Sequence, residues 1–240
     1  MIDRSLNYGR HIVERFLRMA RPFDVVIDIG AGTGVDLAAA SILEPKAKLM
    51  GIEIYEPNAA YLQAAGVEVH QLNIETSSLP CRDETVDVVI ANQVLEHTKE
   101  VFWIFHEVSR VLKVGGHFIV GVPNLASLHN RILLMIGKQP SPIKTASAHV
   151  RGFTKGDILQ FVDVCFPSGY LLVSNAGSNF YPFPRTIARC LANISPSMSW
   201  GLFLLFKKSR RYEGGFVEYP GAMRLETNFF TGTNASPRIK

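Results

Sequence analysis

The sequence predicts an α/β fold, a doubly wound and mostly parallel sheet of seven strands with helices on both faces. Two observations lead to this prediction. Short apolar runs alternate with segments whose apolar residues recur at helical spacing, and this alternation is typical of a parallel sheet covered by helices. The first apolar run, Val25–Ile29, also leads directly into three glycines, as in a strand-to-helix turn that approaches a ligand closely.

Seven apolar runs of strand length predict the strands. The first is the best defined, because Pro22 precedes it and the glycines follow it, and both residue types interrupt regular structure. The strands are expected at residues 25–29, 49–54, 67–72, 86–91, 118–122, 170–174 and 201–206.

Helices are expected between the strands, and the clearest spans residues 100–112. Its residues Val101, Ile104 and Val108 recur at helical spacing and share one face. Two glycines at positions 115 and 116 are predicted to end this helix. Thr154 is predicted to cap a later helix that runs to residue 166. The remaining helices are expected at residues 5–20, 36–43 and 58–64, with a helical stretch around residues 132–136.

These elements predict one domain at residues 1–212. It would contain an insertion over the site at residues 124–152 and an aromatic, proline-rich excursion at residues 180–199. The tail at residues 213–240 is rich in Gly, Asn, Thr and Pro, and the sequence assigns it no role.

The composition limits the partners. The 240 residues are 47% hydrophobic and 19% charged, as in a globular protein with a core. The formal charge of +4 allows an anionic acceptor or peripheral contact with a membrane, but it is too small to indicate nucleic acid. Three cysteines without a paired spacing, and a polar, Arg-rich N-terminus, predict a cytoplasmic protein. The oligomeric state is not predicted.

The glycine turn is the most informative motif. Residues 25–34 read VVIDIGAGTG, with an acid inside the strand and glycines at 30, 32 and 34. A dinucleotide-binding turn would need its third glycine at the position of Val35, and a phosphate-binding loop would need Gly-Lys-Ser/Thr. Both alternatives are therefore disfavoured, and with them a dehydrogenase.

This strand, acid and glycine turn resemble the hallmark of class I S-adenosylmethionine-dependent methyltransferases. Later segments of the chain match the same family in order and spacing: the acid Glu53, the pair Asn73-Ile74, the fourth strand with its exit, and the helix, turn and fifth strand of residues 110–124. The resemblance covers roughly residues 23–166. It implies a Rossmann-like seven-stranded fold, S-adenosylmethionine as cofactor and transfer of a methyl group.

The resemblance also implies which residues hold the cofactor. Asp28 would suit its cationic end, the glycine amides its carboxylate, and Glu53 the ribose diol. Asn73 and Ile74 would hold the adenine, although Asn73 could equally serve a loop. The predicted cofactor-binding residues are Asp28, Gly30, Ala31, Gly32, Gly34, Glu53, Ile54, Asn73, Ile74, Asn92 and Gln93.

His97 and Glu96 are the predicted catalytic residues. If the segment after the fourth strand is helical, Gln93, Glu96 and His97 share one face beside the expected sulfonium. An imidazole titrates near neutral pH and suits a general base. The alternative is a structural histidine.

The same segment resembles the Glu-x-x-Glu-His metal segment of ubiquinone-pathway O-methyltransferases and of small-RNA 3′-end methyltransferases. His149 resembles the later histidine of the RNA enzymes. Gln93 replaces the first acid, however, and a neutral amide is a poorer ligand for a hard cation. The prediction is therefore a site without a metal, with metal dependence as the alternative.

The predicted function is methylation of an oxygen or nitrogen in a small-molecule, glycan or lipid-linked acceptor. Arg131, Lys138, Lys144 and Arg151 make the insertion basic, which favours an anionic or membrane-borne acceptor. The alternatives are a metal-dependent quinone-pathway or RNA 3′-end methyltransferase, and a cofactor-binding scaffold without activity.

Overall fold

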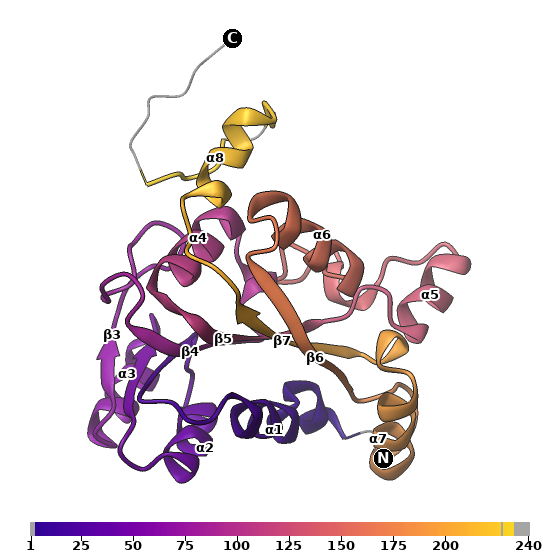
Figure 1. The fold of residues 1–240 in the computed structure, drawn as a ribbon. Helices are drawn as coiled ribbons and strands as arrows, with labels where there is room; N and C mark the ends of the chain where they lie inside the picture. Colours follow the sequence, from indigo (N-terminus) through magenta and orange to yellow (C-terminus); the bar gives the residue numbers. More distant parts are fainter. Residues whose placement is uncertain (1–2, 227, 233–240) are drawn as a thin grey trace.

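The computed structural model describes residues 3–226 and 228–232. It contains a seven-stranded sheet in the order β3-β2-β1-β4-β5-β7-β6 (Figure 1). All neighbouring strands pair in parallel except β7, which is antiparallel to both β5 and β6. The predicted fold class is confirmed. The strands are β1 (Val25–Ile29), β2 (Lys48–Ile52), β3 (Glu68–His70), β4 (Val86–Asn92), β5 (Leu112–Pro123), β6 (Tyr170–Ser178) and β7 (Gly201–Lys208).

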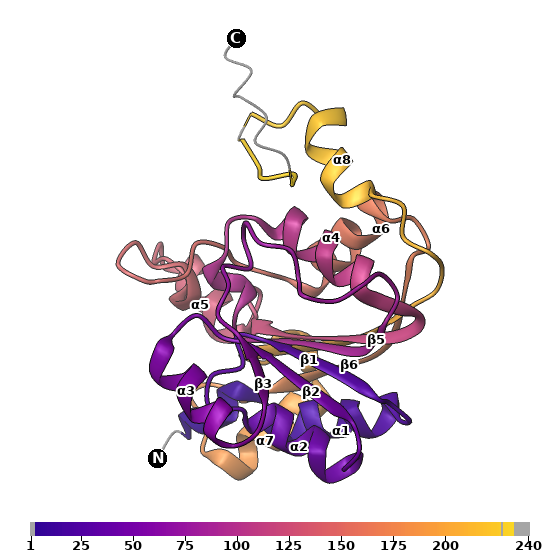
Figure 2. The same ribbon diagram turned by 90° about the vertical axis from the view of Figure 1, so that its left-hand side faces the viewer.

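Helices cover both faces of the sheet. α1, α2 and α7 lie below it in both views, with α3 on the same side beside β3, whereas α4, α6 and α8 lie above it (Figures 1 and 2). The central strands are buried on both faces and therefore consist of continuous apolar runs. The helices are α1 (Arg10–Ala20), α2 (Val35–Leu43), α3 (Glu56–Ala64), α4 (Val101–Val111), α5 (Leu128–Met135), α6 (Lys155–Cys165), α7 (Arg185–Ile194) and α8 (Gly215–Ala222).

The two faces of the sheet have separate apolar cores. On the α1/α2 face, Phe16, Leu37 and Ile90 belong to one buried cluster. On the α4/α6 face, Phe105 and Phe118 belong to a second cluster and meet edge to face at 5.4 Å between ring centroids. Alternate residues of the central strands contribute to opposite clusters, and this fixes the register of the sheet.

The predicted N-terminal helix is interrupted. A 3₁₀ turn, η1 (Arg4–Tyr8), precedes α1, and Gly9 separates the two with φ of 53°. A Cβ at Gly9 would lie 2.2 Å from the ring of Phe203. The positive φ and this close approach explain why the helix begins at Arg10 and not at residue 5.

The prediction that Gly115 and Gly116 end the fourth helix is wrong. α4 ends at Val111, and Leu112 is already extended with φ of −70° and ψ of 131°. The glycines lie inside β5, where pairing with β4 shifts between Val86 and Val88. A Cβ at Gly116 would lie 3.0 Å from the carbonyl oxygen of Asp87, so this irregular stretch of the strand needs a glycine.

The insertion and the excursion both contain helices. α5 and the 3₁₀ turn η3 (Ser141–Ile143) lie in the insertion, and α7 and η4 (Pro196–Met198) lie in the excursion. Thr154 caps α6 as predicted, because its Oγ1 accepts a hydrogen bond from the amide of Asp157. No described helix has the length and apolarity needed to cross a bilayer.

The tail packs on the domain through the part that the structure describes. Phe216 of α8 is fully buried beside Phe105 and Phe161. Further on, the amide of Phe230 donates to Glu100 at 2.7 Å. Residues 227 and 233–240 of the predicted tail lie outside the described residues.

Candidate functional site

The glycine turn lies at the carboxyl end of β1. Gly30, Gly32 and Gly34 all have positive φ, at 70°, 55° and 75°. The amides of Gly30 and Ala31 donate to the carbonyl of Ile52, which ties the turn to β2. A Cβ added at Gly30 or Gly34 would collide with a side chain, whereas one at Gly32 would meet only a carbonyl oxygen at 4.0 Å. The turn is therefore open at Gly32, where a ligand can approach the backbone.

Asp28 lies in β1 just before the turn and is 3% exposed. Burial raises the pKa of its carboxyl well above the usual value, the charge of Asp36 adds to this, and Arg10 opposes it. Arg10 donates to Asp36 at 2.6 Å, and Asn92 donates to the same oxygen at 2.8 Å. Arg10 therefore neutralises one acid of this buried group, and a cation bound near Asp28 would stabilise the ionised form of the other.

Glu53 follows β2 and is almost completely buried. One of its carboxylate oxygens accepts from the amide of Gly32 at 2.8 Å, and the other accepts from the amide of Tyr55 at 2.7 Å. Each oxygen keeps a further lone pair for a hydroxyl donor. Glu53 thus braces the open point of the glycine turn and can still accept hydrogen bonds from a ligand.

Three of the four buried polar atoms without partners belong to the end of β4 and the residues just after it. Within the described residues the four atoms are Asn92 Oδ1, Gln93 Nε2, Glu96 Oε2 and Arg151 Nε. Arg151 is held beside Glu96 by the backbone, because the amide of Arg151 donates to the carbonyl of Glu96 at 3.3 Å. Leaving such atoms unpaired costs about 1–3 kcal/mol each, so their concentration at one place indicates a ligand-binding site.

The segment after β4 is not the α-helix that the shared-face argument needs. It forms a single 3₁₀ turn, η2 (Leu95–His97), and Gln93 lies before it with φ of 59°. The backbone amide of Gln93 donates to the carbonyl of Gly121 in β5 at 2.7 Å. This pairing holds the positive-φ backbone of Gln93, and the helical spacing that would put Gln93 on one face with Glu96 and His97 is absent.

Glu96, His97 and His149 lie together in the structure, although the two histidines are 52 positions apart in the sequence. Their nearest ligand-type atoms all lie within 4.8 Å of one another. The two imidazole rings meet edge to face at 4.6 Å between centroids. Burial raises the pKa of Glu96 to about 7. Burial also lowers the pKa of His97, against the opposing effect of the Ala148 carbonyl, so its ring is neutral at neutral pH.

Asn73, Ile74 and Ile54, which are predicted to contact the cofactor, are exposed or only partly buried. Asn73 is exposed, and its side-chain oxygen accepts from the amide of Glu75 at 2.9 Å, as in an Asx turn. Ile54 is 68% exposed, whereas Ile74 packs against the α4/α6 core. The structure describes a loop role for Asn73. Adenine binding by Asn73 and Ile74, and cofactor binding by Ile54, stay predictions.

Two residues at the site were not predicted to bind the cofactor or act in catalysis. Asp36 resembles an ordinary acid in the first turn of a helix, yet it is 2% exposed and pairs with Arg10. In the sequence, Arg151 is one of several basic residues in the insertion. In the structure it is partly buried, and this burial lowers the pKa of its guanidinium. No signal in a single sequence separates either from a solvent-exposed charge.

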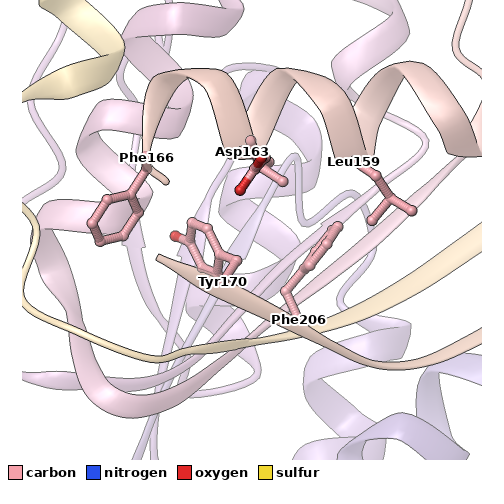
Figure 3. Close-up of a pocket in the computed structure, with 6 residues that line it drawn as sticks. Leu159, Asp163, Phe166, Tyr170 and Phe206 are labelled. Atoms are coloured by element: carbon pink, nitrogen blue, oxygen red, sulfur yellow. The ribbon is translucent and has the colours of Figure 1, made fainter. Parts of the chain in front are cut away.

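Two cavities within the described residues lie under α6. One, of about 240 Å³, is bounded by Phe102, Phe153, Arg151 and Leu95, and Leu95 directly precedes Glu96 in the chain. The other, of about 200 Å³, lies at the amino end of β6, and Figure 3 shows Tyr170 and Phe206 facing α6 across it. Only the first adjoins the residues after β4.

A family model described as a methyltransferase domain matches residues 27–120. The chain is 33% identical over 94 residues to a probable S-adenosylmethionine-dependent methyltransferase of Mycolicibacterium smegmatis, covering 39% of this chain and 37% of that protein. It is 24% identical over 234 residues to a malonyl-[acyl-carrier protein] O-methyltransferase of Marinomonas sp., covering 89% and 83%. The chain spans about a third of the length of the first curated relatives that it matches.

The fold is similar to that of a chain from a Haloferax volcanii complex between the Trm112 methyltransferase activator and a putative methyltransferase. The TM-score is 0.61 at 14% identity, with 86% of this chain and 90% of that chain covered. This likeness bears on the fold alone. The matched segment, residues 27–120, contains the glycine turn, Glu53 and the residues after β4.

Proposed function

We propose that this chain is a class I S-adenosylmethionine-dependent methyltransferase that methylates an oxygen or nitrogen of a small-molecule, glycan or lipid-linked acceptor. S-adenosylmethionine is the methyl donor. The observation that carries the proposal is the concentration of unpaired buried polar atoms on residues 92–96 and on Arg151, beside the glycine turn. A ligand that supplied partners to these atoms would remove their desolvation cost.

The residues at the carboxyl ends of β1 and β2 fit the cofactor. Asp28 would hold its cationic end, and the open backbone at Gly32 would lie against it. Glu53 would accept the ribose hydroxyls with its remaining lone pairs. The sulfonium supplies an activated methyl group and a good leaving group, so the protein's task is to align the acceptor and remove its proton.

His97 would remove that proton. A general base must be unprotonated when the acceptor arrives, and burial keeps the pKa of His97 below its usual value. The contact of its Nδ1 with the Ala148 carbonyl, at 3.3 Å, orients the ring and leaves Nε2 for the acceptor. Glu96 would position the neighbouring residues, because its carbonyl holds the amides of Val150 and Arg151 in the insertion.

The test measures S-adenosylhomocysteine formed from S-adenosylmethionine with a panel of acceptors. His97→Ala is expected to lower kcat about 10²–10⁴-fold while cofactor affinity stays unchanged. His117→Ala is the matched control, because His117 is a partly buried histidine of β5 outside the site. Full activity of His97→Ala across pH would exclude His97 as the base. Unchanged calorimetric affinity in both Asp28→Ala and Glu53→Ala would refute the cofactor site.

A specific observation favours a second candidate, a methyltransferase that depends on a divalent metal. Glu96, His97 and His149 offer a carboxylate and two imidazoles within 4.8 Å. The Nδ1 atoms of the histidines contact the carbonyls of Ala148 and Pro142, at 3.3 and 2.7 Å. This is how metal-binding histidines are usually oriented, with Nε2 toward the ion. A bound ion would supply Lewis-acid activation of an acceptor oxygen.

The metal candidate is tested by titrating the purified protein with Mn²⁺ and with Zn²⁺. Binding that His149→Ala weakens at least about tenfold, together with activity lost on chelation and restored by metal, would support it. His129→Ala is the control, since His129 belongs to the same insertion and hydrogen-bonds Ser141 instead. Activity indifferent to chelator would leave His97 as a base in a metal-free site.

A further inference from the structure

Helix α7 exposes an apolar stripe. Phe183, just before the helix, and Ile187 and Ile194 within it are 37%, 49% and 75% exposed. Ile187 and Ile194 are separated by seven positions, so they share one helix face, and Phe183 lies just before the extended N-cap Pro184. The opposite face is formed by Ala188 and Ala192, which are buried against Phe180 and Leu6. The helix therefore packs on the domain with its small residues and turns its large apolar residues to solvent.

Helix α5 and the residue after it expose a second apolar group. Ile132, Leu134, Met135 and Ile136 are 50%, 58%, 85% and 60% exposed. Four large apolar side chains within five consecutive residues are far from the scattered apolar residues that ordinary protein surfaces contain. A patch of this kind indicates an interaction surface.

The two helices are neighbours at one end of the sheet. Leu128 of α5 packs against the cluster that contains Ala188 and Ala192 of α7. α5 follows the carboxyl end of β5 and α7 follows that of β6, which is the end that carries the glycine turn. Figure 1 shows both helices on the same side of the molecule. We call their exposed residues the α5–α7 surface.

The charge around the α5–α7 surface is predominantly positive. Residues 108–156 and 164–212 contain no Asp or Glu. Exposed cations outnumber the nearby acids, which include Asp3, 3.4 Å from Arg185, and Glu14, which acts with Arg185 and Arg189 on His11. These cations are Arg131, Lys138, Lys144, Arg185 and Arg189.

We propose that the α5–α7 surface docks on a membrane that contains anionic lipids. Large apolar side chains flanked by Lys and Arg bind a lipid interface by inserting the apolar groups while the cations meet the head groups. A second copy of the chain fits this surface poorly, because a two-fold contact would place its arginines and lysines against their own copies. Docking presents the carboxyl end of the sheet, with the proposed site, to the lipid head groups. It does not depend on the methyl transfer.

The experiment is co-sedimentation of the purified chain with vesicles. One set contains phosphatidylcholine alone, and the other contains equal parts of phosphatidylcholine and phosphatidylglycerol. Wild-type protein is expected to bind the anionic set and to lose this binding as salt is raised. Ile194→Glu and Met135→Glu should each weaken binding about tenfold or more, because they place a carboxylate among the inserted side chains. Arg189→Ala should weaken it about fivefold.

Ile42→Glu is the matched control. Ile42 of α2 is 78% exposed, as Ile194 is 75% exposed, but it lies outside the two segments without acids. All four substituted side chains are exposed, so the variants should melt at the wild-type temperature and bind S-adenosylmethionine equally well.

The proposal is overturned by three results. One is the absence of binding to anionic vesicles, and another is equal loss of binding in Ile42→Glu and Ile194→Glu. The third is a stable dimer, seen by analytical ultracentrifugation, that Ile194→Glu dissociates. Each is independent of methyltransferase activity, so failure of this proposal and failure of the proposed function are distinguishable.

Discussion

The two ends of the sheet differ in how completely their buried charged side chains are hydrogen-bonded. At the amino end of the parallel strands, Lys208 is 1% exposed, yet its ammonium donates to the carbonyls of Ser109 and Leu112, at 2.8 and 2.7 Å. Glu107 accepts three hydrogen bonds there, from Arg110 and the amide of Leu79. At the carboxyl end, Glu96 is equally buried, and its Oε2 has no partner among the described residues.

We interpret this difference as one between structural polar groups and polar groups that await a ligand. A buried charge whose hydrogen bonds are complete has no capacity left for a ligand, and its removal affects folding. A buried polar group that lacks partners makes the ligand-free protein less stable and becomes satisfied when a ligand binds. The burial of a glutamate alone therefore says little about its role, whereas its hydrogen-bond partners say much more.

The largest effect is expected from Glu107→Ala. The substitution leaves the buried amide of Leu79 without its acceptor and removes two of the hydrogen bonds of the Arg110 guanidinium, which should cost about 3–5 kcal/mol of unfolding free energy. Urea denaturation measures it. The control is Glu44→Ala, which removes a partly exposed ion pair with Arg21 and should cost about 1 kcal/mol or less. Equal losses in the two variants would break the comparison.

Glu96→Gln should act in the opposite direction. The pKa of Glu96 is raised from 4.5 to about 7 in the folded protein. The folded state therefore holds the proton more tightly, and wild-type stability falls as pH rises from about 4.5 to about 7. The uncharged amide escapes this loss, so the variant should be more stable than wild type by roughly 3 kcal/mol at pH 8, and equal to it at pH 4.

Urea denaturation of Glu96→Gln and wild type, with chelator present and at several pH values, checks this expectation. A variant less stable than wild type at pH 8 would show that the Glu96 carboxylate has partners in solution. Glu96 would then belong with Glu107 in the structural class.

A smaller effect is expected in cofactor binding. Asp28→Asn removes the charge that would face the cationic end of S-adenosylmethionine, and affinity should fall about 10- to 100-fold. Asp87→Asn is the control on the neighbouring strand, where the carboxylate pairs with Lys113 and with the amides of Asp24 and Val25. It should lower stability and leave affinity unchanged. The reverse pattern in calorimetry would remove Asp28 from the site.

The pH dependence of affinity gives the finest distinction. Burial and the charge of Asp36 raise the pKa of Asp28. At a pH below that raised pKa, the carboxyl of Asp28 in the free protein is protonated, and a cationic ligand must displace this proton. Wild-type affinity should rise with pH until Asp28 is ionised, with proton release seen as a dependence of the calorimetric heat on buffer. Asp28→Asn should lack both effects.

The sequence predicted the central elements closely. β1 occupies residues 25–29 as expected, and the predicted helices at 36–43 and 100–112 are shifted by one residue at their ends. These segments are buried on known faces, and burial imposes the apolar spacing that a sequence displays. Gly115 and Gly116 misled the prediction, because a glycine pair is compatible with a helix end and with an irregular strand alike.

The sequence by itself determined the sheet and the glycine turn and predicted the cofactor, because each depends on a local pattern of apolar residues and glycines. Only the tertiary structure brought His149 to Glu96 and His97, buried Asp36 and Arg151 at the site, and turned the apolar residues of α7 outward. The physical reason is that contacts between distant segments depend on how the elements pack. Solvent exposure and unpaired hydrogen-bonding groups exist only once that packing is complete.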